Sequence, residues 1–231
     1  MKIVGLIGGT SWHSTIEYYR YINEFVNNHF GDNTNPPLML YTLNQSLIHE
    51  SQRKGDWATI SEMILDAADR LQRGGAEALM MCANTPHKVF DVVNAQTSVP
   101  MIHICDTTAD AIRAKGLSRA GLIGTRFSMQ EKFLVDRFAM SGVEVLTPEP
   151  ENEIVELHRI IQEELTFGRI EAKSKRYVLE SIASLVERGA EGIVLGCTEF
   201  PLMLAADEID VPTFNTTEIH AIAAAKYLLS E

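Results

Sequence analysis

An internal repeat limits the folds that are open to this chain. Residues 75–85, GAEALMMCANT, align without a gap with residues 189–199, GAEGIVLGCTE, so that Cys197 lies opposite Ala83. Each copy has a Gly-Ala-Glu turn, an apolar run of strand length and a short polar segment, which together predict a buried strand followed by a loop. The sequence VGLIG at residues 4–8 recurs in similar form, AGLIG, at residues 120–124. Because the period exceeds the roughly 20 to 50 residues of a solenoid unit, the repeat predicts two similar halves.

Strand-like and helical patterns alternate along the whole chain. The helical period of 3.6 residues is clearest at 57–73, 151–165, 172–188 and 217–229. Apolar runs of strand length occur at 2–7, 38–43, 77–82, 100–104, 120–123, 143–146, 191–196 and 211–214. This alternation predicts an α/β fold in which helices cover both faces of parallel sheets.

The repeat and the alternation together suggest a domain organisation. We place a first α/β domain at residues 1–98 plus 210–231 and a second at residues 99–209. Ligands in such folds bind outside the carboxyl ends of the strands. Both loops of the repeat leave strands at that end, so we expect an active site in the cleft between the domains.

Charge and cysteine content narrow the partners and the compartment. The formal net charge of −11 argues against a nucleic-acid partner. The three cysteines, at positions 82, 105 and 197, are odd in number, which predicts free thiols and a cytoplasmic location. They also lack the paired spacing of a metal site, so we expect no bound metal. No apolar run approaches the roughly 18 residues of a membrane span, so we expect a soluble chain with no membrane partner.

The glycine-rich start, GLIGGTS at residues 5–11, predicts a tight turn into a helix. Its spacing does not fit the G-x-G-x-x-G of dinucleotide-binding proteins, which argues against a nucleotide cofactor. The first N–H groups of the following helix could instead bind an anion such as a carboxylate, with Thr10 adding a hydroxyl donor.

Cys197 is the candidate catalytic thiol. It lies at a strand-to-loop exit, where a helix N-terminus could lower a thiol pKa from about 8.5 toward neutrality. A buried, inert cysteine is the alternative interpretation, but the position at the ligand-binding edge favours a reactive thiol. Cys82 should point away from Ala83 by the two-residue alternation of a strand, and Cys105 is expected in the core.

Four further polar positions are candidates for binding. Asn84 and Thr85 follow the first strand of the repeat, where a turn with a helix cap is the alternative interpretation. Gln52 lies in a polar loop or helix end, and Arg169 follows Gly168 at a predicted helix terminus. Either side chain could bind a second carboxylate of a ligand, and the guanidinium of arginine suits bidentate recognition of such a group. The alternative interpretation is that both side chains are simply solvated.

Three motifs together resemble one known family over essentially the full length. They are GGTSWHST at residues 8–15, NTPH at residues 84–87 and GCTE at residues 196–199. Their order and spacing are similar to those of the cofactor-independent aspartate/glutamate racemases. The resemblance implies two Rossmann-like parallel-sheet domains related by pseudo-twofold symmetry, a homodimer and an amino-acid substrate.

The resemblance also implies a mechanism and a set of site residues. Members of the family racemise amino acids without pyridoxal phosphate or any other cofactor, using two cysteines on opposite faces of the substrate Cα. Cys197 matches the second of these cysteines. The α-carboxylate and amine of the substrate would be held by Thr10, Asn84, Thr85 and Thr198, and its side chain by Gln52 and Arg169.

The chain departs from the family at the first cysteine. Ala83 occupies that position and would only line the substrate, whereas some broad-specificity members carry threonine there. Alanine cannot carry a proton, so we expect weak or one-sided racemase activity. Two alternatives stay open: a single-cysteine decarboxylase or dicarboxylate isomerase, and a catalytically silent protein that binds a small ligand.

Overall fold

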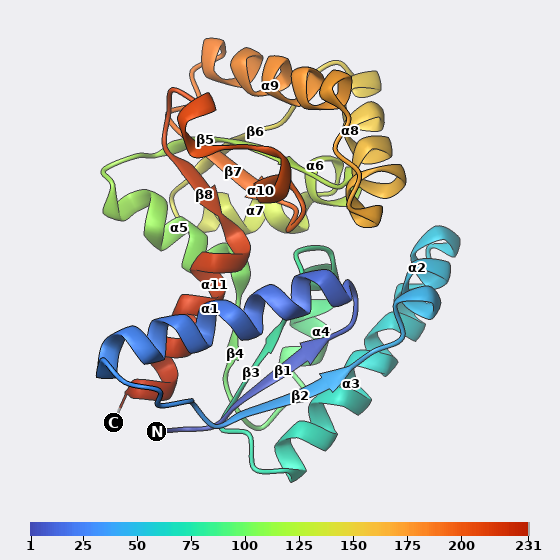
Figure 1. The fold of residues 1–231 in the computed structure, drawn as a ribbon. Helices are drawn as coiled ribbons and strands as arrows, with labels where there is room; N and C mark the ends of the chain where they lie inside the picture. Colours follow the sequence, from blue (N-terminus) through green and yellow to red (C-terminus); the bar gives the residue numbers. More distant parts are fainter. Residues whose placement is uncertain (231) are drawn as a thin grey trace. The chain divides into compact units, whose positions relative to one another are not determined.

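The computed structural model describes residues 1–230; residue 231, with which the predicted first domain ends, lies outside the described residues. The chain forms two compact units. One comprises Met1–Ile104 together with the segment from Thr217 onward, and the other comprises Cys105–Thr216. In Figure 1 the chain runs through the first unit from blue to green, continues through the second unit from green to red, and returns to the first unit in the red helix α11 (Thr216–Leu229).

The first unit contains a four-stranded parallel sheet in the order β2-β1-β3-β4. Its strands are β1 (Val4–Gly8), β2 (Leu38–Thr42), β3 (Ala78–Met81) and β4 (Met101–Ile102). Ile7 of β1 pairs with Met81 of β3, and the N–H of Cys82 donates to the carbonyl of Ile7 at 2.9 Å. The loops that follow β1 and β3 therefore leave the sheet at adjoining points on its carboxyl edge.

Different helices cover the two faces of this sheet because neighbouring strand residues point to opposite sides. The helices of the unit are α1 (Trp12–Phe30), α2 (Gln45–Lys54), α3 (Trp57–Arg73), η1 (Thr85–Val89), α4 (Phe90–Asn94) and α11 (Thr216–Leu229). Leu6 and Met80 pack with α1 and α11, whereas Ile7 and Met81 pack with α3, η1 and α4. Burial on both faces explains why the sequences of β1 and β3 are continuous apolar runs.

The second unit repeats this topology, with the strand order β6-β5-β7-β8. Its strands are β5 (Arg119–Gly124), β6 (Glu144–Leu146), β7 (Ile193–Gly196) and β8 (Thr213–Asn215). Its helices are α5 (Ile104–Ala114), α6 (Arg126–Gln130), α7 (Lys132–Met140), α8 (Glu151–Glu163), η2 (Leu165–Phe167), α9 (Ala172–Glu187), α10 (Phe200–Met203) and η3 (Ala206–Glu208). The strands of the sequence repeat, β3 and β7, thus hold equivalent places, and the predicted α/β class with two similar parallel sheets is confirmed.

A close approach of β5 and β7 precedes Cys197. Gly124 pairs with Gly196, and a Cβ atom added at Gly196 would lie 2.7 Å from Leu122 Cδ1 and 3.0 Å from the carbonyl oxygen of Ile123. Only glycine fits there without a shift, so the backbone that delivers Cys197 is held tightly against its neighbour. Among the described residues, no helix is long and apolar enough to cross a membrane.

Candidate functional site

The loop after β1 turns sharply into α1, as the glycines predict. Gly9 has a φ of +83°, and a Cβ atom there would lie 2.2 Å from the carbonyl oxygen of Leu43. Its N–H donates to Thr15 Oγ1 at 2.9 Å. Thr10, the candidate hydroxyl donor, follows directly and is buried.

The first turn of α1 is already hydrogen-bonded by side chains. The N–H of Trp12 donates to Gln45 Oε1 at 3.3 Å, and the N–H of Ser14 donates to Ser11 Oγ at 3.3 Å. Ser14 Oγ in turn donates to the carbonyl of Cys82 at 2.6 Å. An anion at this helix N-terminus would therefore compete with Gln45 and Ser11, whereas the bond from Ser14 joins α1 to the β3 exit.

The β3 exit carries Ala83, Asn84 and Thr85. Cys82 is fully buried among apolar side chains, and this burial raises the pKa of its thiol. Ala83 is partly exposed, which agrees with the expected alternation, and Asn84 and Thr85 are buried at the start of η1. The structure thus brings Thr10 and Ala83–Thr85 to neighbouring strand ends within the first unit.

His87 holds the backbone of this loop. Its Nδ1 lies 2.9 Å from the carbonyl oxygen of Ala83, and its Nε2 accepts the N–H of Ile104 at 3.2 Å. Because Nε2 is the acceptor, we assign the ring proton to Nδ1, which donates to Ala83. His87 is therefore a neutral imidazole whose two ring nitrogens both bind the backbone.

Cys197 forms a compact polar group with its two neighbours in the second unit. Cys197 Sγ donates to Glu199 Oε2 at 2.9 Å, and Thr198 Oγ1 donates to the same oxygen at 2.7 Å. Cys197 is 7% exposed and Glu199 is 4% exposed. A buried carboxylate oxygen thus accepts the thiol proton and the hydroxyl proton together.

This environment raises the pKa of the Cys197 thiol well above its ordinary value. Burial is the largest cause, and the negative charge of Glu199 and the bond to it act in the same direction. Backbone N–H groups of Thr198 and Glu199 oppose this effect but do not outweigh it. The prediction of a lowered thiol pKa was wrong, because the helix that follows, α10, has four residues and begins only after the carboxylate.

The two candidates for binding a substrate side chain lie on other elements. Gln52 is in the last turn of α2, about two turns beyond Gln45. Arg169 follows η2, where its guanidinium donates to the carbonyl of Glu163 at 2.8 Å and lies 5.3 Å from the centre of the Phe167 ring. Arg169 therefore sits at the C-terminal end of α8, as its predicted helix terminus implies.

Sequence reasoning did not single out Glu199 as the partner of the thiol. The pairing of Gly124 with Gly196 places the loop that begins at Thr125 beside the loop of Cys197. Among the residues that the structure describes, no group of three His, Cys, Asp or Glu side chains could hold a metal ion.

Comparison with known proteins identifies a matching family and similar solved structures. Residues 7–224 match the family model described as Asp/Glu/Hydantoin racemase. A crystal structure of an aspartate racemase homologue from Pyrococcus horikoshii OT3 is 35% identical over the full length of both chains, with a TM-score of 0.87. A Yersinia pestis protein is 42% identical, again over all of both chains, with a TM-score of 0.94.

A more distant relative is the broad specificity amino-acid racemase RacX of Bacillus subtilis. It is 20% identical over 219 residues, which cover 93% of each chain. The family model spans most of the chain and both strands of the repeat, so the resemblance drawn from the three motifs is confirmed. This chain belongs to the Asp/Glu/hydantoin racemase family.

Proposed function

We propose that this protein is an enzyme that moves a proton at the Cα of a small amino acid, with Cys197 as its catalytic thiol. The observation that carries the proposal is the hydrogen-bonded group of Cys197, Thr198 and Glu199 at the carboxyl end of β7. A thiol next to a buried carboxylate can both release and regain a proton. The family of the chain, whose named relatives include amino-acid racemases, supports this assignment.

The proton can move in two steps that balance. Cys197 first passes its Sγ proton to Glu199 Oε2, 2.9 Å away, and the resulting thiolate removes the proton from Cα. The electron pair of the broken C–H bond stays on Cα. Return of a proton to the same face reverses these steps, and general acid–base help of this kind contributes roughly 100- to 10,000-fold.

We assign substrate binding to polar residues at the carboxyl ends of both sheets. In the first unit Thr10, Asn84 and Thr85 are buried polar side chains at neighbouring strand ends, which suits them to bind an α-carboxylate and an amine. Thr198 contributes from the second unit. Gln52 and Arg169 are the proposed contacts to the substrate side chain.

The first unit lacks a proton carrier at the position where the family has one. Ala83 has no ionisable group, and His87 beside it uses both ring nitrogens for backbone hydrogen bonds. Cys82 is fully buried in the core with a raised thiol pKa. We therefore expect exchange of the Cα proton on one face to be faster than inversion.

The same geometry favours a second candidate, a decarboxylase. When a carboxylate leaves as carbon dioxide, the electron pair of the broken C–C bond stays on the carbon and needs a single proton. The raised thiol pKa keeps Cys197 protonated, which is the state that such a step requires. The thiolate would then regain its proton from water.

The quaternary structure and the compartment are also proposed. The family resemblance supports a homodimer. The three cysteines are free, and free thiols suit a reducing compartment such as the cytoplasm.

Proton NMR in D₂O tests the proposal. Each enantiomer of aspartate, glutamate and several neutral amino acids is incubated with the protein, and deuteration and inversion at Cα are followed together. Cys197→Ala should abolish exchange, and Cys105→Ala, which removes another buried thiol, is the matched control.

Each outcome of the experiment distinguishes among the candidate functions. Exchange without inversion supports a one-sided site, and release of carbon dioxide from a dicarboxylate supports the decarboxylase. Exchange that survives in Cys197→Ala contradicts the assignment of the thiol, and tight binding without any chemistry indicates a silent binding protein.

A further inference from the structure

One edge of the sheet in the first unit is open. Within the described residues, β2 pairs with β1 alone and is the outer strand of the order β2-β1-β3-β4. The N–H of Leu43 donates to the carbonyl of Gly8 in β1 at 2.9 Å. Backbone groups alternate in direction along a strand, so the N–H and C=O groups of Leu38, Leu40 and Thr42 point away from β1. A further strand could bond to these groups.

β2 lacks the features that usually protect an edge strand. Its sequence, LMLYT, has five residues with no charge and no proline. The equivalent edge strand of the second unit, β6, has three residues and carries Glu144, which pairs with Arg119 at 2.8 Å. The other edge strands, β4 and β8, have two and three residues. Of these four strands, β2 is therefore the best suited to pair with another strand.

Apolar side chains lie exposed beside this edge. Leu40 is 50% exposed, and it lies on the face of the sheet that α1 covers, because its register partner Leu6 packs there. Trp12, Ile16 and Tyr19 of α1 are 53%, 52% and 55% exposed. Their spacing of four and three residues places them on one side of the helix. We call these three side chains the α1 row.

Helix α1 turns this row toward β2. On one flank of the helix, Ser14 Oγ donates to the carbonyl of Cys82, after β3, at 2.6 Å. On the other flank, Thr15 and Leu40 lie together over Gly8, where an added Cβ atom would lie 2.8 Å from Thr15 Oγ1 and 2.9 Å from Leu40 Cδ1. By the helical period of 3.6 residues the α1 row lies beyond Thr15 and opposite Ser14, on the side of the open edge.

We propose that β2 and the α1 row form the interface of a homodimer, in which β2 pairs antiparallel with β2 of a second copy. A twofold axis at Leu40 places Leu40 opposite itself and Leu38 opposite Thr42 of the second copy. This register uses every backbone group of β2 that points outward, since opposed residues of a hydrogen-bonded pair exchange both of their bonds. The same axis brings the two α1 rows together on one face of a continuous sheet. The proposal rests on the homodimer proposed above and names its surface.

The size and charge of this surface fit a second copy. Leu40 and the α1 row together expose roughly 400 to 500 Å² of apolar surface, more than half of the about 800 Å² that each partner contributes to a standard interface. The charged residues next to the row, Glu17, Arg20 and Glu24, pair with one another, so no lone charge has to be buried. An uncharged edge that matches itself under a twofold rotation is what a symmetric dimer requires.

Charges at position 40 test both the edge and its register. Because residue 40 faces itself across the axis, Leu40→Asp and Leu40→Lys each bring like charges together and should weaken dimerisation by about 100-fold or more. An equimolar mixture of the two proteins opposes unlike charges and should restore a dimer, which also shows that both variants fold. Sedimentation velocity of the full chain measures each protein and the mixture.

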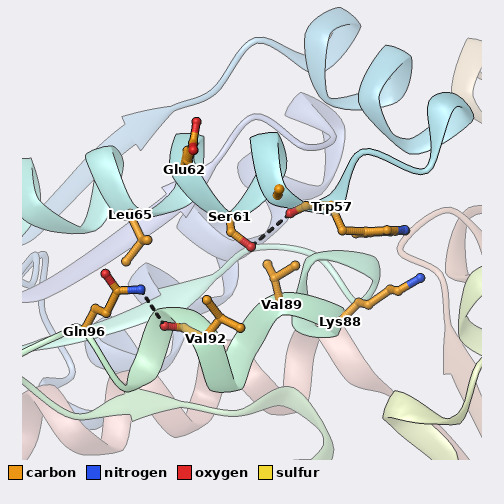
Figure 2. A pocket seen from close by; sticks show the side chains of 9 residues that line it. Trp57, Ser61, Glu62, Leu65, Lys88, Val89, Val92 and Gln96 are labelled. Carbon is orange, nitrogen blue, oxygen red and sulfur yellow. Dashed lines mark hydrogen bonds between the residues drawn. The ribbon is translucent and has the colours of Figure 1, made fainter.

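Two further variants separate this surface from the rest of the unit. Ile16→Asp changes the α1 row and should also weaken dimerisation. Val92→Asp is the matched control, because Val92 is 53% exposed and lines a hollow of about 650 Å³ between α3 on one side and η1 with α4 on the other (Figure 2). This protein should sediment as the unmodified protein does.

The outcomes distinguish the surface from the homodimer itself. If the unmodified protein is a monomer at about 100 μM, both are wrong. A dimer that persists in Leu40→Asp and Leu40→Lys, or that dissociates in Val92→Asp, keeps the homodimer but overturns this surface. Two monomeric variants that do not associate when mixed overturn the axis at Leu40. Exchange at Cα is measured separately, so a failure of the proposed chemistry leaves these results unchanged.

Discussion

Burial and the neighbouring carboxylate of Glu199 together hold the proton on Cys197. A thiol beside a helix N-terminus is usually activated by a lowered pKa, but here burial and the nearby negative charge keep the proton on sulfur. The cost of forming the thiolate is offset only if Glu199 takes up the proton. In the proposed mechanism the two side chains act together as one proton-carrying pair.

Replacing Glu199 by glutamine separates the two effects of the carboxylate. Glu199→Gln removes the charge that raises the thiol pKa, so alkylation of Cys197 by iodoacetamide should begin at lower pH than in the unmodified protein. Cα exchange should nevertheless fall by roughly 100-fold, because the proton acceptor is lost. Peptide mapping by mass spectrometry across a pH series gives the alkylation profile. Glu180→Gln, an exposed change on α9, is the control, and an alkylation profile identical to that of the unmodified protein would contradict the pairing.

Placing a thiol at position 83 tests the proposal that the first unit lacks a second proton carrier. Ala83 is partly exposed at the β3 exit, so a cysteine fits there without entering the core. Ala83→Cys should raise the rate of inversion by roughly 100- to 10,000-fold and bring it closer to the rate of exchange. Chiral chromatography of incubated aspartate and glutamate measures it. Ala95→Cys adds a thiol at an exposed position after α4 and should change neither rate.

At the scale of elements, a buried histidine joins three parts of the first unit. Tyr18 OH of α1 donates to His220 Nδ1 at 2.8 Å, and His220 Nε2 on α11 donates to the carbonyl of Ile102 in β4 at 2.9 Å. Burial first, and then the neighbouring His87, lower the pKa of His220 to about 3. The imidazole is therefore neutral in the folded protein over the whole physiological range.

This depressed pKa predicts a loss of stability in acid. An unfolded histidine takes up a proton near pH 6.5, whereas folded His220 does so only near pH 3, so its contribution to stability is intact above about pH 6.5 and is lost as the pH falls toward 3. His220→Gln should lower the free energy of unfolding at pH 7 by about 1 to 3 kcal/mol but make it less dependent on pH. Urea unfolding at pH 7 and pH 4.5 measures both.

The control for this prediction is an exposed histidine. His29→Gln lies at the end of α1 and should leave the pH dependence unchanged. An equally steep loss of stability in His220→Gln would mean that other groups, such as His158, whose burial also lowers its pKa, dominate the acid response.

Element predictions succeeded where the hydrophobic stripe was continuous. Helix α3 begins at Trp57 and ends at Arg73, as the apolar period over 57–73 predicts. Helix α2 was foreseen only as a possible helix end at Gln52, because it buries just Ile48 and Ser51 and so leaves little apolar pattern. Its ends are set instead by Asn44, which caps the N-terminus, and by Gly55 with a φ of 70°.

At the scale of the whole molecule, the two units differ in how the chain builds them. The second is a continuous segment with its own apolar cluster, which extends from Ile123 to Ile209. The first is completed by α11, whose Ala221, Ala224 and Leu228 are fully buried with Tyr18, Val4 and Met80. Its strands therefore depend on a helix encoded more than a hundred residues after β4.

Fragments that correspond to the two units should differ in whether they fold on their own. Residues 105–216 should melt cooperatively on their own, whereas residues 1–104 should not, because the face that α11 covers would meet water at a cost of several kcal/mol. Joining residues 217–230 to residue 104 through a short glycine-serine linker should restore a cooperative transition. Circular dichroism melting curves compare the three proteins, and a cooperative melt of residues 1–104 alone would contradict the assigned role of α11.

The sequence alone determined the α/β class, the two similar halves and the family, because apolar period, turn residues and motif spacing are local properties of a chain. The alignment of the two copies also drew attention to Cys197 and to Ala83 at the equivalent position, whose roles stay proposals. Tertiary structure decided that the Cys197 thiol keeps its proton and that both ring nitrogens of His87 bind the backbone. The thiol pKa depends mainly on burial by residues distant in the sequence, and His87 is held in part by the N–H of Ile104, 17 residues away, so a local pattern could not predict either.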